Sequence, residues 1–107
     1  MSGTIPASNS NPFWLAAKVN GNGVLQVNKG RYPCASSRVS TGLYTITPPT
    51  ANPFDNTYYI VNITCQVESA YATARVVNSS LSVSSFQVMT YINTTSADCM
   101  FHFTVLI

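Results

Sequence analysis

Residues 57–67, TYYIVNITCQV, carry the alternation that decides the fold class of this chain. In an extended strand successive side chains point to opposite faces, so residues two apart share a face. The face that we expect in the core holds Tyr59, Val61, Ile63, Cys65 and Val67. The opposite face holds Tyr58, Ile60, Asn62, Thr64 and Gln66. The stretch therefore predicts a β-strand with one buried face.

The same period of two recurs on both sides of this stretch, and no helical period competes with it. Gly21-Asn22-Gly23 separates two alternating runs and permits the positive φ angles that tight hairpins require. Gly42 interrupts another run in the same way. Further strands are expected within residues 13–20, 24–28, 38–47, 72–77, 86–92 and 97–107. In the last run, Cys99, Phe101, Phe103, Val105 and Ile107 share the face that we expect in the core.

These elements predict one all-β domain. A chain of 107 residues fits a single core. Seven or eight short strands with frequent turn signals favour a β-sandwich or a jelly-roll-like fold. We place this domain at residues 13–107. Residues 1–12, MSGTIPASNSNP, lack any apolar period and are expected to form an extended N-terminal arm, while the proline-rich residues 47–55 are expected to form a stiff loop.

The composition favours contact with other subunits. Hydrophobic residues make up 46% of the chain and charged residues only 7%, whereas soluble domains usually carry about 25% charged residues. Serine, threonine and asparagine must therefore supply much of the polar surface. Burying such neutral groups costs less than burying lysine or glutamate, so this surface suits extensive protein–protein contact.

Charge and hydropathy argue against several partners. The formal net charge is +2, and the five cations are scattered along the sequence. Nucleic-acid binding needs a clustered basic patch, which the sequence does not show. No run approaches the ~18 apolar residues of a membrane span, and the basic start and apolar middle of a signal peptide are missing. We expect neither nucleic-acid binding nor membrane insertion.

The residues that carry enzyme chemistry are scarce, so we expect no catalytic site and no cofactor. Three carboxylates and one imidazole give little chance of convergence. Alternation places His102 on the face opposite Cys99, which argues against a nucleophile–base pair. Three separate cysteines and one histidine do not form a zinc site, although a ring of His102 side chains around a threefold axis is an alternative. Cys65 and Cys99 are interpreted as small core residues and Cys34 as a loop residue, open to solvent.

Two sets of residues are candidates for protein contact. The second face of the last strand, with Met100, His102 and Leu106, is too apolar to face water. Together with Met89 and Tyr91 of the preceding strand, it predicts a trimer interface. A strand covered on both sides within one subunit explains the same pattern equally well. The arm is interpreted as a strap over a neighbouring subunit, anchored by Ile5, Pro6, Phe13 and Trp14; a loose terminus is the alternative. The six tyrosines are further contact candidates for protein or sugar partners.

From about residue 14 to its end, the chain resembles a small β-domain of tailed bacteriophages, often found at the C-terminal ends of tail-fibre proteins. The resemblance rests on an opening V-N-G-N-G strand, a T-G-x-Y-x-I strand, a proline-containing loop, an N-Y-x-V strand and a closing F-x-V segment. The matching stretches in this chain are WLAAKVNGNGVL, VSTGLYTITPP, YYIVNITCQ and SSFQVMTYINTTSADCMFHFTVLI.

The resemblance implies a homotrimer in a virion that is made in the bacterial cytoplasm, and it supplies no catalytic residues. In fibre proteins this domain follows a long shaft, whereas here only a dozen residues precede the matching region. That difference favours a capsid decoration, or cement, protein that binds the major capsid protein or other virion proteins. The alternative is the receptor-binding tip of a tail fibre or head fibre, which binds a host surface receptor or glycan.

Overall fold

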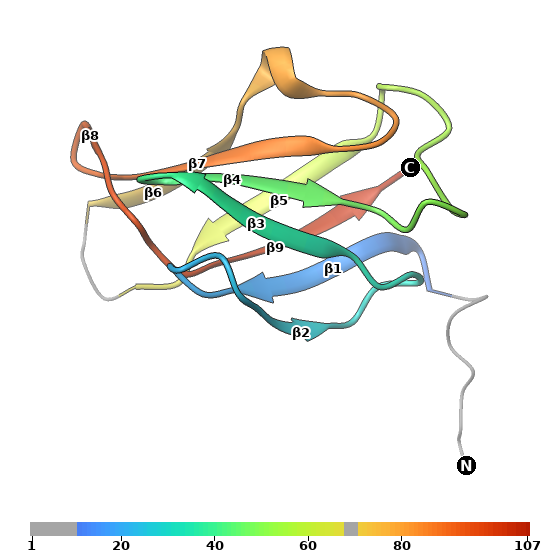
Figure 1. The fold of residues 1–107 in the computed structure, drawn as a ribbon, viewed down its shortest axis with the longest axis horizontal. Coiled ribbons are helices and arrows are strands. Elements are labelled where there is room, and N and C mark those ends of the chain that lie inside the picture. The colour runs from blue at the N-terminus through green and yellow to red at the C-terminus, as the bar shows by residue number, and fades with distance from the viewer. Residues whose placement is uncertain (1–10, 68–70) are drawn as a thin grey trace.

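The computed structural model describes residues 11–67 and 71–107, which form two antiparallel sheets packed face to face (Figure 1). The four-stranded sheet has the order β2 (Leu25–Asn28), β1 (Phe13–Val19), β9 (Phe101–Leu106) and β5 (Ile60–Cys65). The five-stranded sheet has the order β3 (Ala35–Ser40), β4 (Leu43–Thr47), β7 (Phe86–Ile92) and β6 (Ala72–Val76), and β8 (Thr95–Ser96) pairs with β7. The 3₁₀ turn η1 (Asn78–Ser80) connects β6 to β7. The expected all-β sandwich is therefore confirmed at the level of its sheets.

Tight turns close the hairpins at the positions that the glycines indicated. Gly23 in the β1–β2 turn has φ +89°, and Gly42 in the β3–β4 turn has φ +72°. A Cβ atom at Gly42 would lie 2.7 Å from the carbonyl oxygen of Thr90. Both backbone conformation and space therefore require glycine at position 42.

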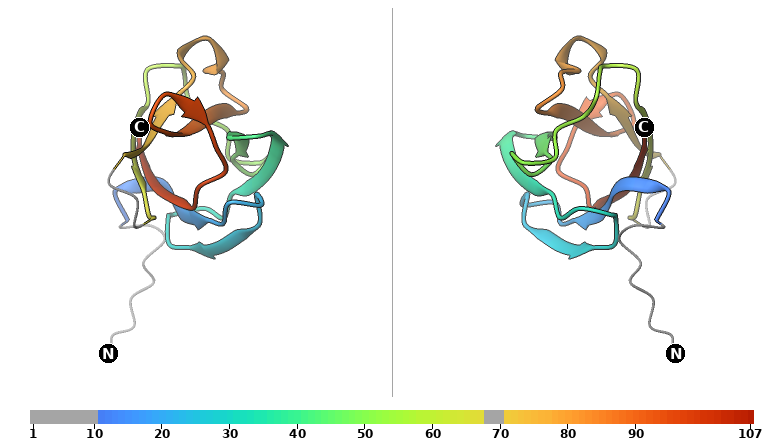
Figure 2. Two further views of the ribbon diagram at one scale, coloured as in Figure 1. Left: turned by 90° about the vertical axis from the view of Figure 1, so that its left-hand side faces the viewer. Right: turned by 90° about the vertical axis from the view of Figure 1, so that its right-hand side faces the viewer.

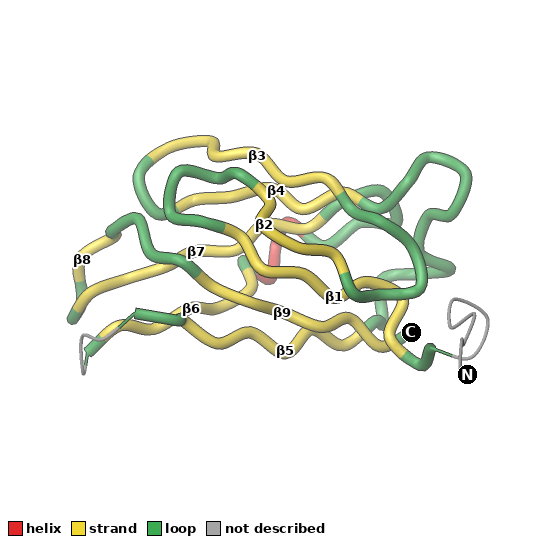
Figure 3. The backbone as a smooth tube through the Cα atoms, turned by 90° about the horizontal axis from the view of Figure 1, so that it is seen from below, coloured by secondary structure: helices red, strands yellow, loops and turns green. Residues whose placement is uncertain are grey.

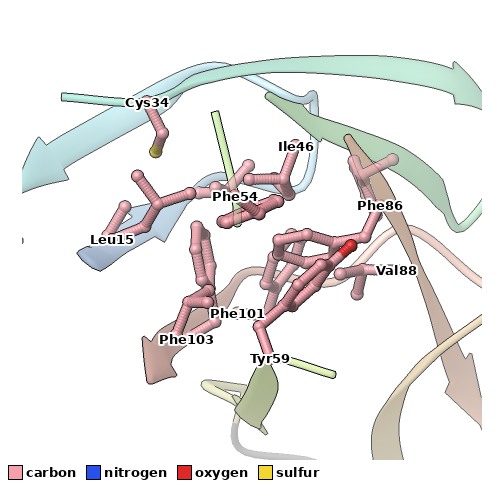
Figure 4. Packing of buried hydrophobic residues seen from close by; sticks show 13 residues of the cluster. Leu15, Cys34, Ile46, Phe54, Tyr59, Phe86, Val88, Phe101 and Phe103 are labelled. Carbon is pink, nitrogen blue, oxygen red and sulfur yellow. The ribbon is translucent and has the colours of Figure 1, made fainter. Parts of the chain in front are cut away.

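The interior between the sheets is filled by aromatic and branched side chains from both of them (Figure 4). The inward face of β9 is buried at Phe101, Phe103 and Val105, as the alternation predicted. Ile107, which was expected in the core on the same face, is instead 44% exposed. Phe103 meets Phe86 of β7 edge to face, with ring centroids 5.8 Å apart. Viewed end-on, the strands surround this interior (Figure 2), and seen from below they lie roughly along the long axis of the molecule (Figure 3).

The loop between β4 and β5 closes one end of the interior. It spans residues 48–59 and contains the expected prolines, but it also buries Phe54, which the alternation of the strands could not identify. The Phe54 ring stacks on Tyr59 at a centroid distance of 4.0 Å, and its amide donates to the carbonyl oxygen of Val83. A loop residue thus contributes a large buried ring to the core.

A polar cluster fastens the opposite end. The Asp98 carboxylate accepts hydrogen bonds from the backbone N–H of Gly42 at 2.7 Å and from Nε of Arg38 at 3.0 Å. The buried Tyr44 hydroxyl donates to the carbonyl oxygen of Gly21 at 2.7 Å and to Asp98 at 3.3 Å. These bonds join two hairpin turns to the segment that leads into β9.

A β-bulge at the start of β1 sets which aromatic residues face outward. Phe13 pairs with Leu106 and Leu15 with Val105. The chain therefore advances by two residues along β1 for one residue along β9. Directly paired residues share a face. Phe13 therefore lies on the outer face with Leu106, whereas Leu15 lies in the core with Val105. Without the bulge, Phe13 and Leu15 would point the same way.

Candidate functional site

The outer face of the four-stranded sheet is the candidate site, because it carries both lysines and exposed apolar side chains. Cross-strand pairing arranges its side chains in rows that run across β2, β1, β9 and β5. One row consists of Val27, Lys18, His102 and Thr64. The next consists of Lys29, Ala16, Thr104 and Asn62. The third, which we call the apolar row, consists of Phe13, Leu106 and Ile60.

A basic hollow lies over the first two rows. It has a volume of about 440 Å³ and is lined by Ala16, Ala17, Lys18, Val27, Lys29, Gln66, His102, Phe103 and Thr104. The small side chain of Ala16 leaves space between longer neighbours. Two lysines and one imidazole border it, and among the residues that the structure describes no carboxylate lines it. Within the same part of the chain, neither lysine has an ion pair.

The apolar row is open to solvent beside the start of the domain. Ile60 is 57% exposed and Leu106 is 40% exposed, while Phe13 is half-buried. Asn11 fixes the chain where it enters this row, since its side chain donates to the carbonyl oxygen of Lys29 and accepts from the amide of Phe13, both at 2.9 Å. The segment expected to be an arm therefore joins the domain next to exposed apolar side chains.

The residues predicted as a trimer interface fall into two separate groups. His102 and Leu106 are exposed on the outer face of the four-stranded sheet, and Met100 immediately precedes β9. Met89 and Tyr91 lie on β7 in the other sheet. There they line a second hollow, of about 480 Å³, in which Nη2 of Arg75 donates to the Tyr91 hydroxyl at 3.0 Å. The five residues do not form one continuous patch.

The predicted arm anchors also differ from one another. Ile5 and Pro6 lie outside the described residues. Phe13 belongs to the apolar row. Trp14 packs edge to face against Tyr32 at 4.7 Å, and its Nε1 donates to the carbonyl oxygen of Asn52 at 3.1 Å. The Trp14 side chain thus holds the β4–β5 loop.

The tyrosines divide between core and surface. Tyr44 and Tyr59 are buried, and Tyr32 packs on Trp14. Tyr58 is 87% exposed and Tyr71 is 67% exposed. Only these two present most of their ring to solvent among the described tyrosines.

Neither family models, curated proteins nor solved structures gave a match to this chain. The surface must therefore be interpreted from its own chemistry. Among residues 11–67 and 71–107, no group of histidine, cysteine, aspartate and glutamate is placed to hold a metal ion. No helix in that part of the chain is long and apolar enough to cross a membrane.

Cys34 and Cys99 are buried, whereas Cys65, which was expected in the core, is only partly buried. Cys34 was expected to be open to solvent in a loop, and that expectation is wrong, because Cys34 is buried in the core cluster. Its Sγ lies 3.2 Å from Oδ1 of Asn28, and burial raises the pKa of the thiol to about 11. Burial is also the main cause that raises the pKa of Cys65 to about 11, and contact with the Cys99 thiol adds to it. Neutral thiols are poor nucleophiles.

Proposed function

We propose that this chain is a structural protein of a bacteriophage particle and that it decorates the capsid, holding neighbouring shell subunits together through buried area. The observation that carries this proposal is the apolar row, exposed beside the junction with residues 1–10. Exposed apolar side chains gathered on a sheet face mark protein–protein contacts. The low charge content of the chain, at 7%, makes such a face inexpensive to bury.

The mechanism is additive burial. Each Å² of apolar surface that leaves water contributes about 25 cal/mol, so a modest contact opposes separation of the shell subunits. A protein that binds the assembled shell and not its separated subunits stabilises the shell by mass action. If three copies are linked, all three contacts must open before the protein leaves, which slows dissociation strongly.

The position of the two candidate interfaces constrains a trimer. The outer faces of the two sheets point in roughly opposite directions (Figure 2). In a closed ring of three copies, the two contact surfaces of each subunit face about 60° apart, so two opposite faces would instead produce an open stack. The two surfaces therefore cannot both form the contacts of a closed trimer. We assign the apolar row and the neighbouring His102 to the capsid contact, and the surface around Met89 and Tyr91 to the trimer contact.

Co-sedimentation with capsids that lack this protein tests the proposal. The purified chain is expected to bind these capsids saturably and to resist dilution. A Leu106→Asp/Ile60→Asp variant should lose occupancy while keeping its native circular dichroism spectrum. Val39→Asp, at an exposed apolar position of β3 in the other sheet, serves as the matched control and should leave capsid occupancy unchanged. Equal capsid occupancy by the apolar-row variant would contradict the proposal.

A second candidate function is receptor binding at the tip of a fibre. The exposure of Tyr58 and Tyr71 favours it, because a rigid exposed ring can stack on a sugar or a protein partner. This function predicts that the isolated protein binds host cells or a glycan array, and that Tyr58→Ala lowers that binding. Binding to host cells without binding to capsids would replace the decoration proposal by this one.

A further inference from the structure

We propose that the outer face of the four-stranded sheet docks an extended acidic segment of a partner protein, with a carboxylate in the basic hollow and an apolar side chain on the apolar row. This inference deepens the proposed function, because it names the chemistry of the surface that the decoration protein recognises. It also applies to any other protein that binds this face.

The positive charge of the hollow indicates that the partner group bound there is negatively charged. Lys18 lies directly opposite His102 in the β1–β9 ladder, and Lys29 lies beside Ala16 on the β2 side. The two lysines are like charges that share one hollow, and no ion pair offsets either of them in the described part of the chain. A carboxylate placed between them gains from both lysines. The Thr104 hydroxyl and the Gln66 amide, which also line the hollow, can donate hydrogen bonds to it.

The surroundings of the hollow favour a protein carboxylate over a nucleic acid. A nucleic acid needs a long basic track, whereas two lysines and an imidazole make a compact site. Beside them lies the apolar row of Phe13, Ile60 and Leu106. A charged phosphodiester backbone would not remove these apolar side chains from water. A basic spot next to exposed apolar side chains suits a peptide that carries both kinds of side chain.

The spacing along β9 sets the pattern of that segment. His102 and Leu106 face the same side and lie four residues apart, which corresponds to roughly 13 Å in a strand. A strand-like partner that lies along β9, with its carboxylate over the row of Lys18 and His102, would therefore carry its acidic residue and its large apolar residue at positions i and i+4. The same two residues at i and i+1 would point to opposite sides and could not both make contact.

An NMR titration of the ¹⁵N-labelled protein with short synthetic peptides tests this inference without capsids. The probe carries glutamate at i and leucine at i+4 in a threonine–serine background. Its controls carry lysine in place of glutamate, or leucine at i+1. We expect shifts at Lys18, Lys29, Thr104 and Leu106 with the first peptide and much weaker binding of the two controls.

Two protein variants separate specific from general charge effects. Lys18→Gln/Lys29→Gln is expected to weaken peptide binding about tenfold, since each exposed ion pair contributes modestly. Ser37→Asp, which lowers the net charge by one at an exposed position of β3 in the other sheet, should leave it unchanged. Equal weakening by both variants, undiminished binding by the double variant, or tighter binding of inorganic phosphate than of the peptide would overturn the proposal. If the peptide binds but capsids do not, decoration fails and this inference stands.

Discussion

At the scale of single residues, Asp98 has the larger structural effect of the two carboxylates that the structure describes. It accepts from Arg38 and from the amide of Gly42, and these bonds, with that of Tyr44, hold its pKa below the usual 3.8. The carboxylate is largely exposed, so solvent screens the Arg38 charge and the bond to the Gly42 amide matters more. Asp98 thus acts mainly by fixing the β3–β4 turn to the segment before β9.

This arrangement predicts an acid-dependent loss of stability. Because the pKa of Asp98 is lower in the folded state, the unfolded state binds the proton more readily, and the stabilisation present at neutral pH is lost as the pH falls below about 4. Asp98→Ala should lower the free energy of unfolding by about 1–3 kcal/mol at pH 7, because the Gly42 amide loses its acceptor. Urea unfolding at pH 7 and pH 3 measures both effects. Asp55→Asn is the control, and an equal change in this variant would contradict the assignment.

The cysteines predict slow thiol chemistry in the folded protein. With pKa values of about 11, Cys34 and Cys65 are almost entirely protonated at pH 8. We expect iodoacetamide to alkylate them at least roughly a hundredfold more slowly than the same residues in urea, since the thiolate is the reactive form. Peptide mass spectrometry after timed quenching gives the rates. Labelling of Cys34 in the native state at the unfolded rate would show that its burial is transient.

At the scale of elements, the bulge in β1 and the β4–β5 loop decide which aromatic residues stabilise the fold and which face outward. The bulge sends Phe13 outward and keeps Leu15 in the core. The loop sends Phe54 inward, where it stacks on Tyr59. Two phenylalanines outside regular strand interiors therefore have opposite roles.

Substitution of these two phenylalanines separates stability from binding. Phe54→Ala should lower the free energy of unfolding by about 3–5 kcal/mol, because it removes a buried ring and leaves a cavity. Phe13→Ala should lower it by about 1 kcal/mol or less, but it should reduce capsid occupancy. Thermal unfolding and co-sedimentation of both variants measure the two effects. A large loss of stability in Phe13→Ala would show that the apolar row is part of the core.

At the scale of the whole molecule, the arm prediction can be sharpened. The sequence placed the boundary after residue 12, but Asn11 bonds to Lys29 and Arg31 and belongs with the domain. Deletion of residues 1–10 is therefore the better truncation. We expect it to leave the unfolding midpoint nearly unchanged and to lower capsid occupancy, measured by sedimentation. Full occupancy by the truncated protein would assign the capsid contact to the sheet face alone.

Oligomeric mass is the second prediction at this scale. Multi-angle light scattering is expected to give three times the mass of 11.6 kDa. Met89→Lys should shift the mass toward that of the monomer, since it places a charge in the proposed contact, while Leu106→Lys should leave the trimer intact. The reverse result would place the trimer contact on the four-stranded sheet.

Alternation along the chain determined the all-β class, most strand positions and which face of β5 and β9 points inward. It failed at the ends of those two runs, where Val67 and Ile107 are exposed. It succeeded within the strands because each strand has one face in the core and one outside, so a period of two reports burial directly. Glycine identified the turns at Gly23 and Gly42 for an equally local reason, namely the positive φ that the backbone needs.

Only the tertiary structure decided which outward residues meet. The separation of Met89 and Tyr91 from His102 and Leu106 depends on the sheet that each strand joins, and alternation carries no information about sheet membership. The basic hollow joins Lys18, Lys29 and His102, which are scattered in sequence and become neighbours through β1–β2 and β1–β9 pairing. Burial of Cys34 and Phe54 follows from long-range packing of loops. Local pattern therefore fixed the elements, and non-local pairing fixed the surface.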